Sequence, residues 1–219
     1  MTYVDFLLWV RGPAFHAALA IFIFGVILRF FEILLLGRKT DYSVPRNNGV
    51  SGGLRTLFSR SLPEKDTFHR SAFVIVAGYV FHIGLFIVIL FFEPHIILID
   101  AVLGIRWPGL PTLFIEAATV ATLLGLIAII INRITHPVLR FLSTTEDYLV
   151  WFVTFLPMLT GFMTFHHILL PYPLMLALHI LSVELLLILF PFTKLMHTFT
   201  LFFARWYNGF NAARRGVEV

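Results

Sequence analysis

The sequence predicts an all-α membrane protein, a bundle of five transmembrane helices, and three observations support this fold class. Of the 219 residues, 59% are hydrophobic and only 13% are charged, and the mean hydropathy is +0.91. Soluble domains are far less apolar. The apolar residues gather in five runs, each long enough to cross a hydrocarbon layer about 30 Å thick. The basic residues gather in the segments on one side of these runs.

Polar segments separate the five apolar runs. The runs cover residues 14–36, 71–92, 111–132, 147–167 and 174–197. The sequence Ser-Thr-Thr-Glu at 143–146 has the pattern of a helix N-terminal cap and introduces the fourth run. The polar segments 38–70 and 198–219 complete a single transmembrane domain over 1–219. Each is either a flexible charged segment or a docking surface for a soluble subunit.

The basic residues predict the orientation. An odd number of spans places the two termini on opposite sides of the membrane. With the N-terminus outside and the C-terminus in the cytoplasm, the inner side holds most of the cations: Arg38, Lys39, Arg46, Arg55, Arg60, Lys65, Arg70, Arg133, Arg140, Lys194, Arg205, Arg214 and Arg215. This is the positive-inside pattern. It accounts for the net charge of +4 without nucleic acid as a partner.

The histidines are the candidate functional residues. The chain has nine histidines and no cysteine, which excludes disulfides, thiolate-held iron–sulfur clusters and covalent haem attachment. His179 and His197 lie eighteen residues apart in the last run. Eighteen residues is five turns of an α-helix, so both rings lie on one face about 27 Å apart. An imidazole near each end of a membrane helix suits two stacked redox centres.

Two further histidines lie at matching depths. His82 lies about 16 Å from the cytoplasmic start of the second run, and His95 lies just past its outer end. Neither His82 nor His197 lies in the outer half of the membrane. His95 and His179 both lie near its outer side. A continuous helix would turn His95 by about 220° from His82, away from a shared face, but Pro94 would break the helix and re-aim it.

The histidine-bearing segments carry a family resemblance. Phe-His-Ile-Gly at 81–84, and Leu-Phe-Pro-Phe-Thr-Lys-Leu-Met-His at 189–197 with His179 at the family's spacing, resemble the cytochrome b membrane subunit of respiratory nitrate reductase, its gamma chain. They also resemble related cytochromes b of heterodisulfide-reductase-like and hydrogenase-linked complexes. Gly25 followed by Arg29 is a weaker match. The resemblance implies that His82 and His197 hold an inner haem b and that His179 holds an outer one.

One position departs from the family. Its second ligand on the second helix falls at Phe92 here. His95 is the candidate replacement, and His166 and His167 are further candidates for the missing ligand. Two haem b groups are expected; a single haem, with His95 an interfacial residue, is the alternative.

Other polar residues suggest supporting roles. His166, His167 and Tyr172 would line a quinol pocket or form an interfacial belt. Glu184, inside the membrane, would carry a proton or bond a neighbouring helix. Arg29, Arg133 and Lys194 near the inner face would pair with anionic haem propionates or are ordinary positive-inside charges.

The resemblance implies a multi-pass subunit of a respiratory complex in the prokaryotic cytoplasmic (inner) membrane. Such a subunit transfers electrons between menaquinone or ubiquinone and an iron–sulfur or catalytic subunit on the cytoplasmic side. A haem-free membrane anchor or a transporter subunit is the alternative from another class, with the histidines serving a proton path or packing.

Overall fold

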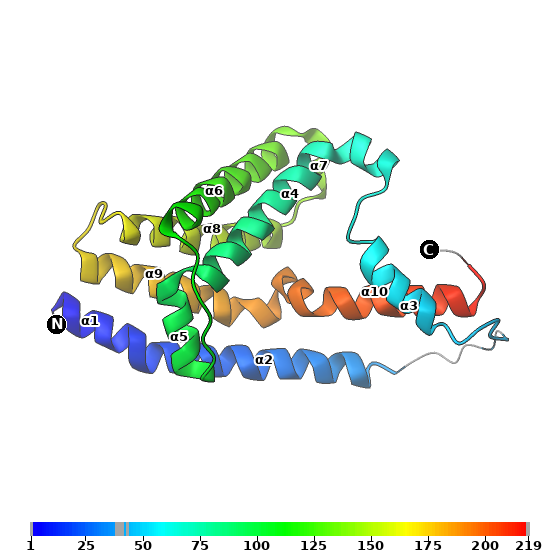
Figure 1. The fold of residues 1–219 in the computed structure, drawn as a ribbon, viewed down its shortest axis with the longest axis horizontal. Coiled ribbons are helices and arrows are strands. Elements are labelled where there is room, and N and C mark those ends of the chain that lie inside the picture. The colour runs from blue at the N-terminus through cyan, green and yellow to red at the C-terminus, as the bar shows by residue number, and fades with distance from the viewer. Residues whose placement is uncertain (1, 38–41, 43, 218–219) are drawn as a thin grey trace. The chain divides into compact units, whose positions relative to one another are not determined.

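The computed structural model describes residues 2–37, 42 and 44–217, and every regular element in these residues is helical (Figure 1). In chain order the elements are α1 (Tyr3–Trp9), η1 (Val10–Ala14), α2 (Phe15–Leu35), α3 (Val50–Ser59), α4 (Lys65–Phe91), α5 (Glu93–Leu103), α6 (Thr112–Thr135), α7 (Pro137–Leu142), α8 (Thr145–Phe165), α9 (Tyr172–Leu189), η2 (Phe190–Phe192), η3 (Lys194–Met196) and α10 (His197–Arg214).

Five helices are long and apolar enough to cross a membrane, as the sequence predicts. They cover Tyr3–Leu35, Lys65–Phe91, Thr112–Thr135, Thr145–Phe165 and Tyr172–Phe192. The protein is therefore an all-helical, multi-pass membrane protein. The orientation with the N-terminus outside stays a prediction.

The first span starts earlier than the sequence analysis places it. Thr2 and Asp5 form a capping box: the side chain of each accepts a hydrogen bond from the backbone N–H of the other. This starts the helix at Tyr3. Pro13 lies inside the span, where the helix adopts one π turn over Val10–Ala14 that accommodates the missing N–H.

The fifth run is not one continuous helix, so the prediction that His179 and His197 share a face of a single helix is wrong. Helix α9 ends at Leu189, and Thr193 is extended, with φ −127° and ψ 179°. Pro191 explains the break, since it lacks the N–H that a continuing helix needs. His197 instead begins α10.

The chain forms two compact units, which are described separately. The first comprises the described residues of Met1–Leu19 and Ser71–Leu187, and the second those of Ala20–Arg70 and Ile188–Val219.

In the first unit, α4, α6 and α8 surround an apolar core of Val88, Ile115, Leu126 and Met158. Gly84 of α4 allows the closest approach to α6, because a Cβ there would overlap Thr122 Oγ1. Small residues are the usual means of bringing membrane helices together.

The second unit contains the polar segments flanking the spans. Much of 38–70 and 198–219 is helical: α3 and the first turns of α4 in the former, α10 in the latter. Helices α3 and α10 pack backbone to backbone, since a Cβ at Gly209 would overlap Thr56 Oγ1 and the carbonyl of Gly52.

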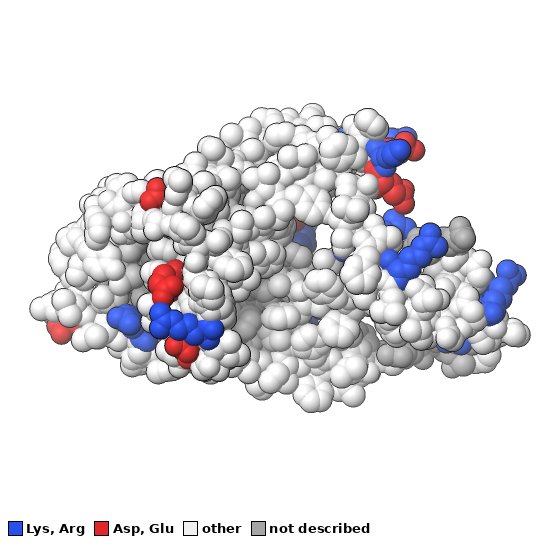
Figure 2. Space-filling view, in the orientation of Figure 1, with Lys and Arg blue, Asp and Glu red and all other residues white. Residues whose placement is uncertain are grey.

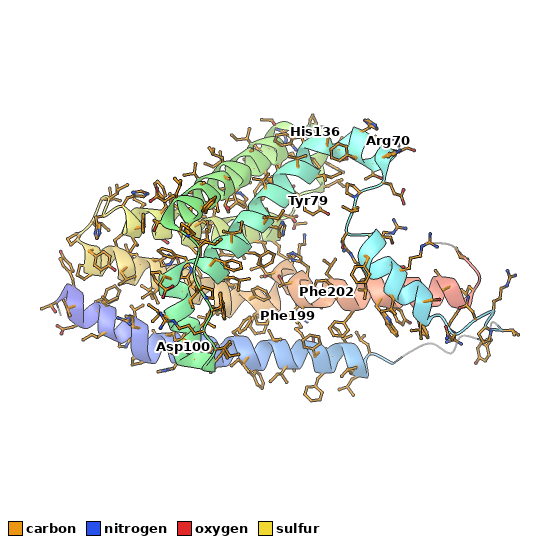
Figure 3. The ribbon with its side chains drawn as sticks, in the orientation of Figure 1. Arg70, Tyr79, Asp100, His136, Phe199 and Phe202 are labelled. Atoms are coloured by element: carbon orange, nitrogen blue, oxygen red, sulfur yellow. The ribbon has the colours of Figure 1, made fainter. Side chains whose placement is uncertain are left out.

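Five phenylalanines join α2 to the end of the fifth span in the second unit. Their ring centroids lie 5.4 to 6.3 Å apart, and most pairs meet edge to face, a favourable arrangement of aromatic quadrupoles. One of them, Phe199, is labelled on α10 in Figure 3. The members are Phe22, Phe30, Phe190, Phe199 and Phe203.

Candidate site: a histidine pair on α5 and α9

The site depends on the break between α4 and α5. Phe92 is extended, with φ −82° and ψ 123°, and Pro94 lies in the first turn of α5. The break deprives the last carbonyls of α4 of their helical donors. A returning segment supplies new ones: Trp107 Nε1–H donates to Leu90 O at 2.6 Å, and Leu110 N–H donates to Phe91 O at 3.0 Å.

His95 adds a second donor to a carbonyl near the end of α4 that already accepts from Phe92 N–H. The Nδ1 of His95 lies 2.9 Å from the carbonyl oxygen of Val88 and donates its hydrogen to it. Phe92 packs edge-on against the imidazole, with ring centroids 5.2 Å apart. Burial lowers the pKa of His95 below its usual value, against a smaller opposing effect of the bond to Val88. The ring is therefore neutral at pH 7 with Nδ1 protonated.

His179 is oriented by two positions on α8. The hydroxyl of Thr160 donates to the carbonyl of Leu156 at 2.8 Å, so its oxygen accepts the hydrogen of His179 Nδ1 at 3.3 Å. Gly161 lets the imidazole lie against the backbone of α8, because a Cβ there would approach Cε1 to 3.0 Å. The ring of His179 is thus fixed in both position and rotation.

The rings of His95 and His179 lie next to each other. Their centroids are 6.2 Å apart and their planes differ by 21°. Two imidazoles that bind one metal ion through nitrogens at about 2 Å each have centroids roughly 6 Å apart. The observed centroid separation of 6.2 Å is close to this value. Both Nδ1 atoms lie within hydrogen-bond distance of protein oxygens, which is the usual arrangement of a histidine that binds a metal through Nε2.

His82 and His197 show the same local pattern. The Nδ1 of His82 lies 2.7 Å from the carbonyl of Gly78, and the Nδ1 of His197 lies 2.7 Å from that of Lys194. Metal-binding histidines typically donate their second ring N–H in this way. His82 belongs to the first unit and His197 to the second, and their pairing stays a prediction.

The remaining histidines lack this feature. The hydrogen bonds of the described residues include none to their rings. The four predicted ligands are thus the four histidines whose Nδ1 is held by a protein oxygen. The other five are His16, His69, His136, His166 and His167.

The residues of the candidate quinol pocket do not all come together. His167 and Tyr172 have ring centroids 5.0 Å apart, whereas His166 packs instead on Phe162, at 4.4 Å. Glu184 lies twelve residues beyond Tyr172, about 18 Å along α9. Glu184 is 4% exposed, and its Oε1 has no hydrogen-bond partner among the described residues.

The three cations predicted to bind propionates have different surroundings. Arg29 Nε–H donates to Pro191 O at 2.9 Å, and its Nη1 pairs with Glu32 at 2.7 Å. Arg133 donates to Ser143 Oγ at 2.8 Å. Lys194 is exposed. Arg29 therefore stabilises the break at Pro191, a role that the sequence analysis missed.

We expect Arg29→Met to lower the free energy of unfolding by about 1–3 kcal/mol, because the buried Pro191 carbonyl loses its donor. Circular dichroism during thermal unfolding in detergent measures the effect. Arg60→Met is the matched control, since Arg60 makes an exposed pair with Glu64 at 3.6 Å, and such pairs contribute little. Equal destabilisation by the two changes would assign no special role to Arg29.

Sequence reasoning also missed the residues that orient the ligands. Thr160 and Gly161 act across a helix interface, and Trp107 acts seventeen residues from Leu90. A polar residue followed by glycine in an apolar span is a signal for close helix packing. It does not indicate which neighbouring ring fills the space.

The fold and the site define a multi-pass helical membrane protein with paired histidines. A protein of Nitratidesulfovibrio vulgaris (strain Hildenborough), described only as "Protein", is 30% identical over 217 residues, which cover 95% of this chain and 94% of the relative. The chain belongs to the same family as that protein. No family model matches the chain, and no solved structure matches it.

Proposed function

We propose that the protein is a cytochrome b subunit of a membrane redox complex. The observation that carries the proposal is the pairing of His95 with His179, at a ring separation of 6.2 Å that suits one metal between them. Haem iron is commonly held by histidine and needs no cysteine. The sequence contains no cysteine.

His95 and His179 would hold the outer haem b, and His82 and His197 the inner one. When bound, haem iron with two imidazole ligands cycles between ferric and ferrous and passes one electron at a time. Hydrogen bonds from Nδ1 to protein oxygens keep each imidazole in the tautomer that presents Nε2 and make it a stronger ligand.

The segment after α5 closes the outer end of this site. Arg106 Nη2 pairs with Glu93 Oε1 at 2.7 Å, and Trp107 binds the last turn of α4. These contacts hold α5, which carries His95, against the end of α4.

The proposed subunit would exchange electrons with a membrane quinone and with an iron–sulfur or catalytic partner in the cytoplasm. In this proposal α3 and α10 lie on the cytoplasmic side of a prokaryotic membrane, and the positive-inside pattern supports that orientation. His167 and Tyr172, which are in ring contact, are the candidate residues for hydrogen bonds to the quinone oxygens, with His166 beside them.

The test is the absorbance spectrum of the chain purified in mild detergent from haem-supplied cells. We expect a sharp α-band on reduction and haem b extractable into pyridine, at two per chain. A colourless preparation that is folded by circular dichroism would contradict the proposal and support the haem-free anchor instead. Tyr172→Phe is expected to leave the haem content unchanged while weakening quinol oxidation.

A further inference from the structure

A cavity lies between α3 and α10, wholly within the second unit. Its volume is about 430 Å³, and the residues lining it include Asn47, Ser51, Arg55, Gly209 and Gly216. This volume falls in the range of small-molecule sites. The space exists because glycines on both helices let the backbones meet and leave no side chains to fill the groove.

The lining presents hydrogen-bond donors without a matching acid. Arg55 is exposed and makes no ion pair with the described residues. Asn47 Oδ1 accepts from Gly49 N–H at 2.8 Å, which leaves its NH₂ group to donate. Ser51 adds a hydroxyl. No aspartate or glutamate is among the lining residues.

A second guanidinium lies at the rim. A Cβ at Gly216 would lie 2.6 Å from Cδ and 3.0 Å from Nη1 of Arg46, so this side chain lies directly over a lining residue. The backbone of Arg46 is tied to α10, since Arg46 N–H donates to Arg214 O at 2.8 Å. In the space-filling view, Lys and Arg gather over α3 and α10 (Figure 2).

Backbone donors complete the lining. Gly53 N–H is bonded to Gly49 O and Val50 N–H to Asn48 Oδ1. Between them, Ser51 N–H and Gly52 N–H have no acceptor among the described residues. These two N–H groups lie at the N-terminal end of α3, near the side chains of Ser51 and Asn47. Free N–H groups at a helix N-terminus attract an anion.

We propose that this cavity binds a phosphate group. Two guanidiniums, an amide NH₂, a hydroxyl and backbone N–H groups match the several oxygens and negative charge of a phosphate, which arginine binds through paired donors. The phosphate belongs either to a lipid headgroup or to a free anion. The site is independent of haem binding.

The experiment uses the full chain in nanodiscs of phosphatidylcholine, titrated with inorganic phosphate and followed by calorimetry. We expect saturable binding that Arg55→Gln weakens at least about tenfold, as expected for a lost charge-assisted bond, and that Arg55→Lys weakens less. Arg60→Gln is the matched control, five residues further along and outside the lining, and it should bind as the wild type does.

A second arm tests the lipid source. The chain is purified from membranes containing phosphatidylglycerol, and retained lipid is measured by mass spectrometry. If the wild type and Arg60→Gln retain the lipid and Arg55→Gln loses it, the site binds a lipid headgroup. If only the phosphate titration shows binding, the site binds a free phosphate. The proposal is overturned if the wild type and Arg55→Gln behave alike in both arms.

Discussion

Replacing His95 with alanine should reduce the haem content from two groups per chain to one. The proposed outer iron would keep a single protein ligand, His179, and a haem held on one side only is easily lost from a hydrophobic protein in detergent. His179→Ala should give the same stoichiometry, because both rings serve one metal in the proposal. The pyridine haemochrome spectrum, divided by the protein concentration, measures the change.

Two controls separate ligand loss from unfolding. His166→Ala removes an exposed imidazole with no ring hydrogen bond among the described residues, and it should leave both haems in place. In His95→Gly, added imidazole should restore the second haem, because the free ring fills the space beside Phe92. Unchanged haem content in His95→Ala would remove His95 from the ligand set and leave the outer site unassigned.

The case of His95 indicates what the sequence could predict. The helical periodicity argued against His95 as a ligand, because a continuous helix turns position 95 away from position 82. Pro94 was the local signal that the helix breaks, and the structure has the break at Phe92. The meeting of His95 with His179 could not be predicted from spacing, because it depends on the returning segment around Trp107 that binds the end of α4.

For the last span, the prediction from the sequence was wrong. The eighteen-residue interval between His179 and His197 suggested one continuous helix, yet Pro191 and the extended Thr193 interrupt it. The sequence contained the proline, but a proline inside a membrane helix can also be tolerated as a kink. The stabilising partner of the break, Arg29, lies 162 residues away in the chain, which no local pattern reveals.

The spans themselves were predictable for a simple physical reason. Hydrocarbon accepts only long apolar segments whose backbone is internally bonded, so length and composition identify them. Packing between the spans is different, because lipid and protein interiors are equally apolar. Close contacts then depend on small residues at particular positions, such as Gly84, and only their three-dimensional neighbours reveal which glycines are essential.

Gly84→Ala is expected to lower the free energy of unfolding by about 2–3 kcal/mol, the upper range for forcing a group into a packed interior. A Cβ at Gly84 would overlap Thr122 Oγ1 and lie 2.9 Å from the carbonyl oxygen of Ala118. The carbonyl belongs to the backbone of α6 and cannot move aside. Helices α4 and α6 must therefore separate, which also loosens the core around Val88 and Leu126.

Gly78→Ala is the matched control, on the same helix and six residues earlier. A Cβ at Gly78 meets no atom within 4 Å, so this change should be neutral or slightly stabilising, as alanine favours a helix over glycine. Adding Thr122→Ala to Gly84→Ala should recover part of the lost stability, because it removes one of the two obstructing atoms and couples the sites. Denaturation of each variant by dodecyl sulfate in micelles, followed by circular dichroism, measures these differences. If Gly84→Ala and Gly78→Ala unfold at the same dodecyl sulfate concentration, α4 and α6 do not pack through Gly84. The positions of His82 and Phe92 relative to α6 would then need to be revised.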